Sequence, residues 1–92
     1  MHIEFDASKN EANIRDCGLS FEQAANFDLG TAIVEQDTRK TYPEVRFVAV
    51  GFLGKRLPVM CFTPAAGGIH VISFRKVNTR EVKDYDQTRT TD

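Results

Sequence analysis

The stretch "VRFVAVGFLGKRLPVMCFTPAAGGIHVISFRKV", residues 45–77, decides the fold, because three strand-like runs follow one another in it with only short breaks. In chain order, the runs and their connections are 45–53, "GK" at 54–55, 56–63, "PAAGG" at 64–68 and 69–77. Connections this short pair neighbouring strands antiparallel. The sequence therefore predicts a sheet in which these three strands are antiparallel neighbours.

Two further strands are expected upstream of this stretch. "HIEFD" at the start of the chain alternates, with Ile3 and Phe5 on one face, and "LGTAIVEQ" at 29–36 is a second strand-like run. The polar segment "DTRKTYPE", residues 37–44, is typical of a connection. We therefore expect a sheet of four to five strands.

A first helix is predicted over "ASKNEANIRD", residues 7–16. Ser8 and Glu11 have the spacing of a capping box, and Asp6 is an alternative cap. Gly18 ends the helix, since glycine readily takes the left-handed conformation found there. Apolar residues are few, so we expect the helix to bury one narrow stripe.

A second helix is predicted directly after the first. Ser20 and Gln23 again have capping-box spacing. Phe21, Ala24 and Ala25 are expected to face inward.

The end of the chain predicts a third helix over "NTREVKDYDQ", residues 78–87, capped by Asn78 and Glu81, and then a polar tail at 88–92. The element order is β-α-α-β-β-β-β-α. This is an α+β fold, with an antiparallel four- to five-stranded sheet, two N-terminal helices and one C-terminal helix. We expect a single domain over 1–87.

Composition limits the classes of function. The 92 residues are 41% hydrophobic and 27% charged, as in ordinary globular proteins. Twelve Lys and Arg against thirteen Asp and Glu give no overall field that attracts nucleic acid, so a basic site has to be local. With no signal-peptide pattern and no apolar run of membrane-span length, the cytoplasm is the expected location, without membrane contact.

Two cysteines, Cys17 and Cys61, are too few for a metal site or a disulfide framework, so neither metal nor cofactor is expected. Cys61 has the surroundings of a small buried apolar residue. Cys17 stands at the end of the first predicted helix, where two interpretations remain open: a packing residue or a reactive thiol.

The predicted strands at 45–53 and 56–63 are apolar on both faces, and such strands need cover on both sides. The first two helices cover one face, and the third covers the other only in part. The remaining apolar residues indicate either a surface for a protein partner or simply the rest of the core.

The one concentration of charge is "FRKVNTREVKDY", which carries Arg75, Lys76, Arg80 and Lys83 within nine positions. Arg80 and Lys83 are three apart on a predicted helix and project together. Arg75 and Lys76 are neighbours at the end of a strand and point to opposite sides of the sheet.

Arginines beside a phenol suit a phosphodiester, because guanidinium pairs with two phosphate oxygens and Tyr85 offers a donor and an acceptor. Arg46 and Arg56 lie on neighbouring predicted strands and are candidates to join Arg75. RNA needs no metal for cleavage if its own 2′-OH is deprotonated and fixed cations hold the developing charge. The alternative is a solvated charged face, partly neutralised by nearby carboxylates.

Residues along nearly the whole chain, from Phe5 to Tyr85, resemble those of the BrnT family of bacterial toxins and follow one another in matching order. The resemblance rests on Phe5, Asp6, Lys9, Asn13, Gly18, Ser20, Phe21, Ala24, Glu44, Arg46, Gly51, Ile72, Ser73, Arg75, Lys76, Glu81 and Tyr85.

This resemblance implies a RelE-like fold and a toxin of a type II toxin–antitoxin system. It implies metal-independent endoribonuclease activity on RNA, which arrests translation. It also implies a BrnA-like ribbon-helix-helix antitoxin that neutralises the toxin, with operator DNA bound only through the antitoxin.

The resemblance also implies roles for single residues. Arg46 and Arg75 would hold phosphate and transition-state charge, and Tyr85 would position substrate or transfer a proton. Lys76 and Arg80 would be weaker RNA contacts. For Arg46 the alternative is an ion pair with the nearby Glu44.

Three positions depart from the family pattern. Asp16-Cys17-Gly18 stands where the family usually has Lys-His-Gly, His70 where an arginine is frequent, and Phe74 where a small residue is frequent. Cys17 and His70 are therefore the candidates for proton transfer. The departures leave a second hypothesis open, a catalytically weakened toxin-like protein that binds the antitoxin and acts as a co-repressor.

Overall fold

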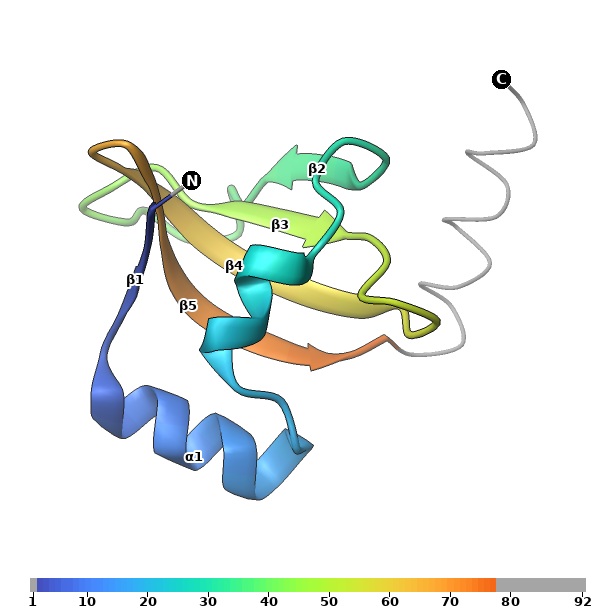
Figure 1. The fold of residues 1–92 in the computed structure, drawn as a ribbon. Helices are drawn as coiled ribbons and strands as arrows, with labels where there is room; N and C mark the ends of the chain where they lie inside the picture. Colours follow the sequence, from blue (N-terminus) through green and yellow to red (C-terminus); the bar gives the residue numbers. More distant parts are fainter. Residues whose placement is uncertain (1, 78–92) are drawn as a thin grey trace.

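The computed structural model describes residues 2–77, and its centre is a five-stranded sheet of order β1-β5-β4-β3-β2 (Figure 1). The strands are β1 (His2–Phe5), β2 (Ile33–Gln36), β3 (Phe47–Val50), β4 (Pro58–Ala65) and β5 (Gly68–Lys76). An α-helix, α1 (Ala7–Cys17), and a 3₁₀ helix, η1 (Phe21–Asn26), lie between β1 and β2. The α+β class is confirmed. The predicted helix over 78–87 lies outside the described residues.

The predicted antiparallel pairing of the three decisive strands is confirmed: β3 pairs with β4, and β4 with β5. Gly54, with φ of 61°, carries the turn after β3, and Gly67, with φ of 72°, carries the turn after β4. The β4–β5 turn is tighter than predicted, because the strands continue to Ala65 and from Gly68. Two residues at positive φ thus fix both hairpins.

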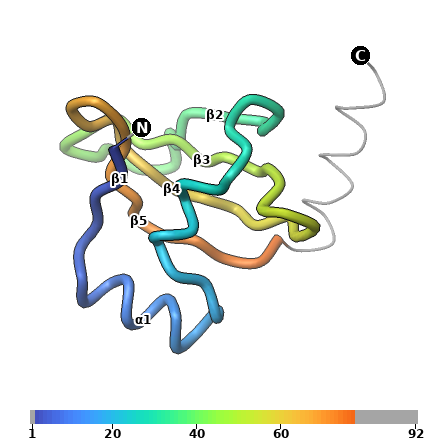
Figure 2. The backbone as a smooth tube through the Cα atoms, viewed as in Figure 1, coloured from blue at the N-terminus to red at the C-terminus, as the bar shows by residue number. Residues whose placement is uncertain are grey.

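The prediction of an all-antiparallel sheet is wrong, because β1 pairs with β5 in parallel. Hairpins fix the relative direction of consecutive strands only. Between β1 and β2, the chain passes through α1 and η1 and reaches the opposite edge of the sheet, as Figure 2 traces. No hairpin therefore sets the direction of β1. Gly68 permits this pairing, since a Cβ there would overlap the backbone of His2.

The ends of α1 follow local chemistry. Asp6, not Ser8, is its N-cap, and its carboxylate accepts a hydrogen bond from the Lys9 backbone at 3.0 Å. Gly18 is its left-handed C-cap with φ of 69°, as predicted. The predicted buried stripe is wrong: α1 has no buried residue, and Ile14 is 45% exposed.

A hydrogen-bonding side chain, rather than an apolar face, attaches α1 to the sheet. The Asn13 amide donates to the Phe74 carbonyl at 2.6 Å and accepts from the Phe74 N–H at 3.3 Å. It also donates to the Leu19 carbonyl at 2.8 Å. Pairing of β1 with β5 ends at Val71, so Asn13 serves backbone groups of β5 beyond the end of β1.

The second predicted helix is a 3₁₀ helix rather than an α-helix. Its buried side chains recur every third residue, at Phe21, Ala24 and Phe27, which suits three residues per turn. Ser20 is its N-cap as predicted, but Ala25 is exposed, contrary to prediction.

The core lies on the face of the sheet that η1 covers, which we call the covered face. Its buried apolar cluster comprises Leu19, Phe21, Ala24, Phe27, Ala49, Leu53, Met60, Phe62, Ile69, Val71 and Phe74. A bulge interrupts β5: Phe62 pairs with Val71 and Cys61 with Ser73. Ile72 is thereby left as the extra residue, and Val71 and Phe74 both reach the core although they are three apart.

The opposite face of the sheet, which we call the open face, carries the alternate strand residues. No helix within residues 2–77 covers it. None of the helices within that range is long and apolar enough to span a membrane.

Candidate functional site

A groove of about 440 Å³ runs over the open face and contains the charged side chain Arg75. Its lining comes from β2 to β5 and from the loop after β2: Glu35, Gln36, Asp37, Thr38, Arg39, Val48, Val59, Cys61, Ser73 and Arg75. We call this the groove. Its lining combines the apolar strand residues Val48 and Val59 with two carboxylates, Glu35 and Asp37, and two guanidiniums, Arg39 and Arg75.

Asp37, directly after β2, is the most constrained charged group of the groove. Its carboxylate accepts from Arg39 Nε at 3.0 Å and Nη2 at 2.9 Å, and from the Tyr42 hydroxyl at 3.1 Å. These hydrogen bonds, with that from Arg39 the largest, hold the pKa of Asp37 well below its usual range. The same pairing raises the pKa of Arg39 above its usual range.

Arg46 lies directly before β3, next to the same loop. Its guanidinium stacks on the Tyr42 ring, 4.2 Å from the ring centroid. Its Nε donates to Glu44 at 3.1 Å, so the predicted alternative of an ion pair with Glu44 is confirmed. Arg46 lines a second hollow of about 310 Å³, which shares residues Gln36, Asp37 and Thr38 with the groove.

Several of these charges act on the pKa of the Cys61 thiol. Burial raises the pKa of its thiol, and the charge of Asp37 raises it further, while Arg46, Arg39 and Arg75 act in the opposite direction. Two guanidiniums from the segment between β2 and β3 and one from β5 therefore lower the pKa of one thiol in the groove. Cys61 is partly exposed, not buried as predicted, because it faces the groove rather than the core.

Arg75 and Lys76 point to opposite sides of β5, as predicted. Arg75 lines the groove, and its Nη1 donates to the Lys76 carbonyl at 3.2 Å. Lys76 instead lines a hollow with Arg56 and Pro58. Arg56 is therefore the candidate cation that does not join Arg75.

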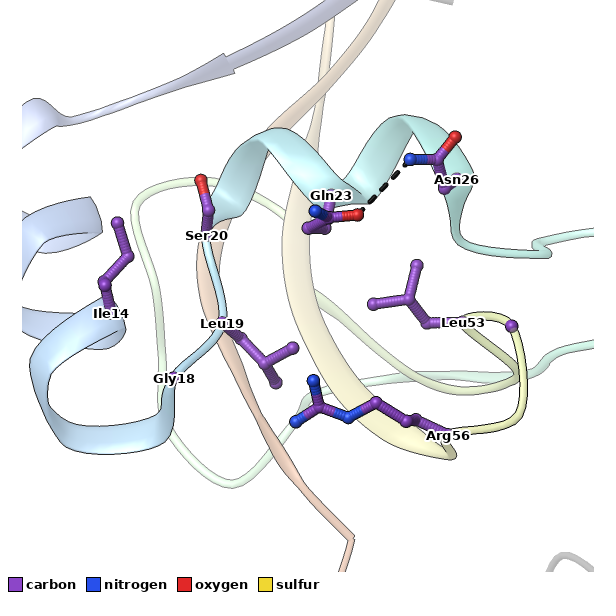
Figure 3. A pocket seen from close by; sticks show the side chains of 9 residues that line it. Ile14, Gly18, Leu19, Ser20, Gln23, Asn26, Leu53 and Arg56 are labelled. Atoms are coloured by element: carbon purple, nitrogen blue, oxygen red, sulfur yellow. Dashed lines mark hydrogen bonds between the residues drawn. The ribbon is translucent and has the colours of Figure 1, made fainter.

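Arg56 also borders a larger hollow of about 520 Å³ between α1, η1 and the turn after β3. In Figure 3, Leu19, Leu53 and Arg56 point toward one another across it. Leu19 and Leu53 belong to the buried core, so this hollow lies on the covered side of the sheet, away from Arg75.

The two candidates for proton transfer lie outside the groove. His70 Nδ1 is 3.3 Å from Glu4 of β1, so it joins two paired strands at the edge of the sheet. Cys17 is the last residue of α1 and is partly buried. Neither lines the groove. The remaining predicted site residues, Tyr85 and Arg80, lie outside the described residues.

Sequence reasoning missed the loop contribution to the groove. Asp37 and Arg39 belong to a polar segment that resembles any surface connection, and nothing in its pattern indicates a buried carboxylate. Glu35 also lines the groove, and its place there can be inferred only once the register of β2 against β3 is known. Among residues 2–77, no three His, Cys, Asp or Glu side chains lie close enough together to hold a metal ion.

Comparisons with known proteins agree with this architecture. A family model described as "Ribonuclease toxin, BrnT, of type II toxin-antitoxin system" matches residues 5–81. The crystal structure of the Brucella abortus ribonuclease toxin BrnT matches with a TM-score of 0.66 and 28% sequence identity, over 86% of this chain and 99% of that chain. None of the curated protein sequences compared with the chain matches it. The family match includes every residue that lines the groove.

Proposed function

This chain belongs to the BrnT family of ribonuclease toxins of type II toxin–antitoxin systems, and on that premise we propose that it is an endoribonuclease that cleaves RNA in the groove. RNA cleavage arrests translation in the host cell. The reaction uses the 2′-OH of the RNA as nucleophile and requires no metal ion.

The observation that carries this proposal is that Arg39 and Arg75 line the groove and that Arg46 lines the hollow that shares Gln36, Asp37 and Thr38 with it. Guanidinium groups bind phosphate oxygens through two parallel hydrogen bonds and keep their charge at every physiological pH. The groove also offers apolar surface at Val48 and Val59 beside the two guanidiniums, which suits the bases and the phosphates of a single strand. The feature is local, which suits a chain whose total charge is −1.

In the proposed reaction, the 2′-oxygen of a ribose attacks the adjacent phosphorus, and the bond from phosphorus to the 5′-oxygen of the next nucleotide breaks. The products are a 2′,3′-cyclic phosphate and a free 5′-hydroxyl. Charge develops on the non-bridging oxygens in the transition state, where fixed guanidiniums stabilise it most. We assign this role to Arg75 and Arg46. Weaker contacts are assigned to Arg80 and to Lys76, which lies on the other side of β5 and would contact RNA only beyond the groove.

Proton transfer is assigned to Tyr85, on the residue-by-residue resemblance alone, since the family match ends at residue 81. His70 and Cys17 receive no such role, because the imidazole is engaged with Glu4 and neither side chain lines the groove. The second hypothesis, a catalytically weakened co-repressor, rests on the three departures at Cys17, His70 and Phe74, and the activity test below separates it from the ribonuclease.

The proposed partner is a BrnA-like ribbon-helix-helix antitoxin, with operator DNA bound only through that partner. The near balance of 12 cationic and 13 anionic side chains supports this division, because the toxin itself has no general attraction for DNA. Copurification with the product of an adjacent short gene tests it. Recovery of the tagged chain alone from cells that express both genes contradicts it.

The activity is tested by expression in a bacterial host and by RNA cleavage in EDTA with the purified chain. We expect growth arrest and 2′,3′-cyclic phosphate ends, with Arg75→Ala reducing cleavage about 100- to 1,000-fold. Arg15→Ala on α1, a cation 73% exposed and far along the chain from the groove, is the matched control and retains activity. Normal growth together with intact RNA in EDTA contradicts the proposal.

A further inference from the structure

The two side chains of one ion pair at the groove, Asp37 and Arg39, differ widely in their exposure to solvent. The Asp37 side chain is only 2% exposed, whereas that of its partner Arg39 is 80% exposed. Within residues 2–77, Asp37 is the only charged residue that is buried. Burying a carboxylate is costly unless it is fully paired. Ordinary surface pairs such as Arg15 with Asp16, exposed on both sides, carry no such cost.

The contacts of Asp37 fix the plane of the Arg39 guanidinium. Nε donates to Oδ1 at 3.0 Å and Nη2 to Oδ2 at 2.9 Å, and the Arg39 backbone N–H donates to Oδ1 at 3.2 Å. Within residues 2–77, Nη1 donates no hydrogen bond. Asp37 therefore holds the guanidinium through Nε and Nη2. The side containing Nη1 is left exposed to solvent at the groove.

The same carboxylate is also connected to Arg46. The Tyr42 hydroxyl donates to Asp37 Oδ2, and the ring of Tyr42 lies beneath the Arg46 guanidinium. The Asp37 N–H donates to the Arg46 carbonyl at 2.8 Å. One buried group thus braces two of the three guanidiniums that act on Cys61.

We propose that Arg39 is a further phosphate-binding residue of the groove and that Asp37 is the positioning residue that holds its guanidinium toward the RNA backbone. This rests on the proposed ribonuclease function. Donors fixed before the substrate arrives need no reorganisation when it binds, which is the advantage of a buried carboxylate over a mobile surface partner. The competing explanation is that the pair only closes the loop between β2 and β3.

Binding and cleavage are measured separately. Affinity is measured with a single-stranded RNA carrying 2′-O-methyl groups, which lacks the attacking hydroxyl, over a range of salt concentrations. Cleavage is measured with the unmodified strand. Arg39→Ala is expected to weaken affinity about 10-fold or more and to reduce the slope of log K against log salt by about 0.7. Arg15→Ala, the matched control, leaves both unchanged.

Arg39→Lys separates charge from geometry. Lysine keeps the positive charge, so the salt slope returns close to that of the wild type. A lysine cannot reproduce the planar fork that engages Asp37 on one edge and phosphate on the other, so cleavage stays below that of the wild type. Full recovery of cleavage by Arg39→Lys overturns the assigned geometry.

A double-mutant cycle tests the positioning role. Asp37→Asn is expected to weaken RNA affinity about 10-fold in the wild-type background and less than about threefold in the Arg39→Ala background, because the effect acts through Arg39. A merely structural Asp37 gives equal losses in both backgrounds, which overturns the role. Thermal denaturation checks whether Asp37→Asn folds. If it does not, Tyr42→Phe, which removes one hydrogen bond to the same carboxylate, replaces it in the cycle.

The outcomes distinguish this inference from the proposed function. If the wild-type chain cleaves RNA and Arg39→Ala binds and cleaves it equally well, Arg39 is not part of the site, and the proposed ribonuclease function stands. A wild-type chain that binds RNA through Arg39 without cleaving it removes the ribonuclease and retains the phosphate contact. A wild-type chain that neither binds nor cleaves RNA overturns both.

Discussion

The two faces of the sheet carry different kinds of side chain, although the residues of both faces alternate along the same strands: one face holds the apolar core and the other holds the charged groove. On the covered face, Phe74 is fully buried and packs edge-on against Phe27, with ring centroids 5.8 Å apart. One residue later, Arg75 faces the groove. The covered face contributes free energy of folding through apolar burial, whereas the open face holds the charged side chains of the groove.

The bulge in β5 makes this division possible. Simple alternation from Val71 would place residues 73 and 75 on the same face as Val71, which is the core. The extra residue Ile72 shifts the alternation, so Phe74 enters the core and Arg75 reaches the open face. A local irregularity in one strand therefore decides on which face the cation stands.

The difference between the two faces is tested most directly by truncating two consecutive residues of β5, Phe74 and Arg75, whose side chains lie on opposite faces. Phe74→Ala removes a fully buried ring and is expected to lower the free energy of unfolding by about 3–5 kcal/mol. Arg75→Ala is expected to change it by less than about 1 kcal/mol. Urea denaturation measures both. Equal losses for the two variants mean that Arg75 is part of the folding core.

A smaller effect is expected where α1 joins the sheet by hydrogen bonds. Asn13→Ala leaves the Phe74 backbone groups without this partner and is expected to cost about 1–3 kcal/mol. Asn26→Ala, which removes only an exposed bond to Gln23, is the matched control, with a change within about 0.5 kcal/mol. An unchanged denaturation midpoint for Asn13→Ala contradicts the role of Asn13 as the attachment of α1.

The sequence predicted those parts of the fold that depend on neighbours in the chain. Short connections with Gly54 and Gly67 gave the hairpins, and Gly18 gave the end of α1. The parallel pairing of β1 with β5 joins residues more than 60 positions apart, so no local pattern indicates it. For η1 a signal was present: the three-residue spacing of Phe21, Ala24 and Phe27 favours a 3₁₀ helix.

The candidate site was harder to predict than the fold, for a physical reason. Whether Arg46 or Arg56 faces Arg75 depends on strand register, and a one-residue slip exchanges the two faces. The bulge at Ile72 adds such a slip. Asp37 and Arg39 lie in a polar loop whose burial is set by tertiary packing. Residue type therefore indicated the chemistry of the arginines, but not which of them meet.

A change of pH sharpens the comparison, because it acts on the open-face network and spares the apolar core. The pKa of Asp37 is lower in the folded chain than the ordinary value of about 3.9. Its contribution to stability is therefore present above that ordinary value and is lost as pH falls from there toward the folded pKa. Tm of the wild type is expected to fall more steeply than Tm of Asp37→Asn between about pH 5 and pH 2.5. Parallel curves contradict a charged, paired Asp37.

The smallest expected effect is on the reactivity of one thiol, and it reports the field of the groove directly. In a Cys17→Ser background, alkylation of Cys61 by iodoacetamide is expected to be slower at pH 8 than that of free cysteine, because burial and then the charge of Asp37 raise its pKa. Arg46→Gln removes a charge that lowers this pKa, so alkylation slows further. Asp37→Asn removes a charge that raises it, so alkylation becomes faster. Opposite responses of the thiol to the two variants show that both charges act on Cys61, whereas a rate that one variant leaves unchanged shows that its charge does not act there. Mutations on the covered face that preserve folding, such as Phe74→Leu, leave the rate unchanged, because that face contributes no charge to the thiol.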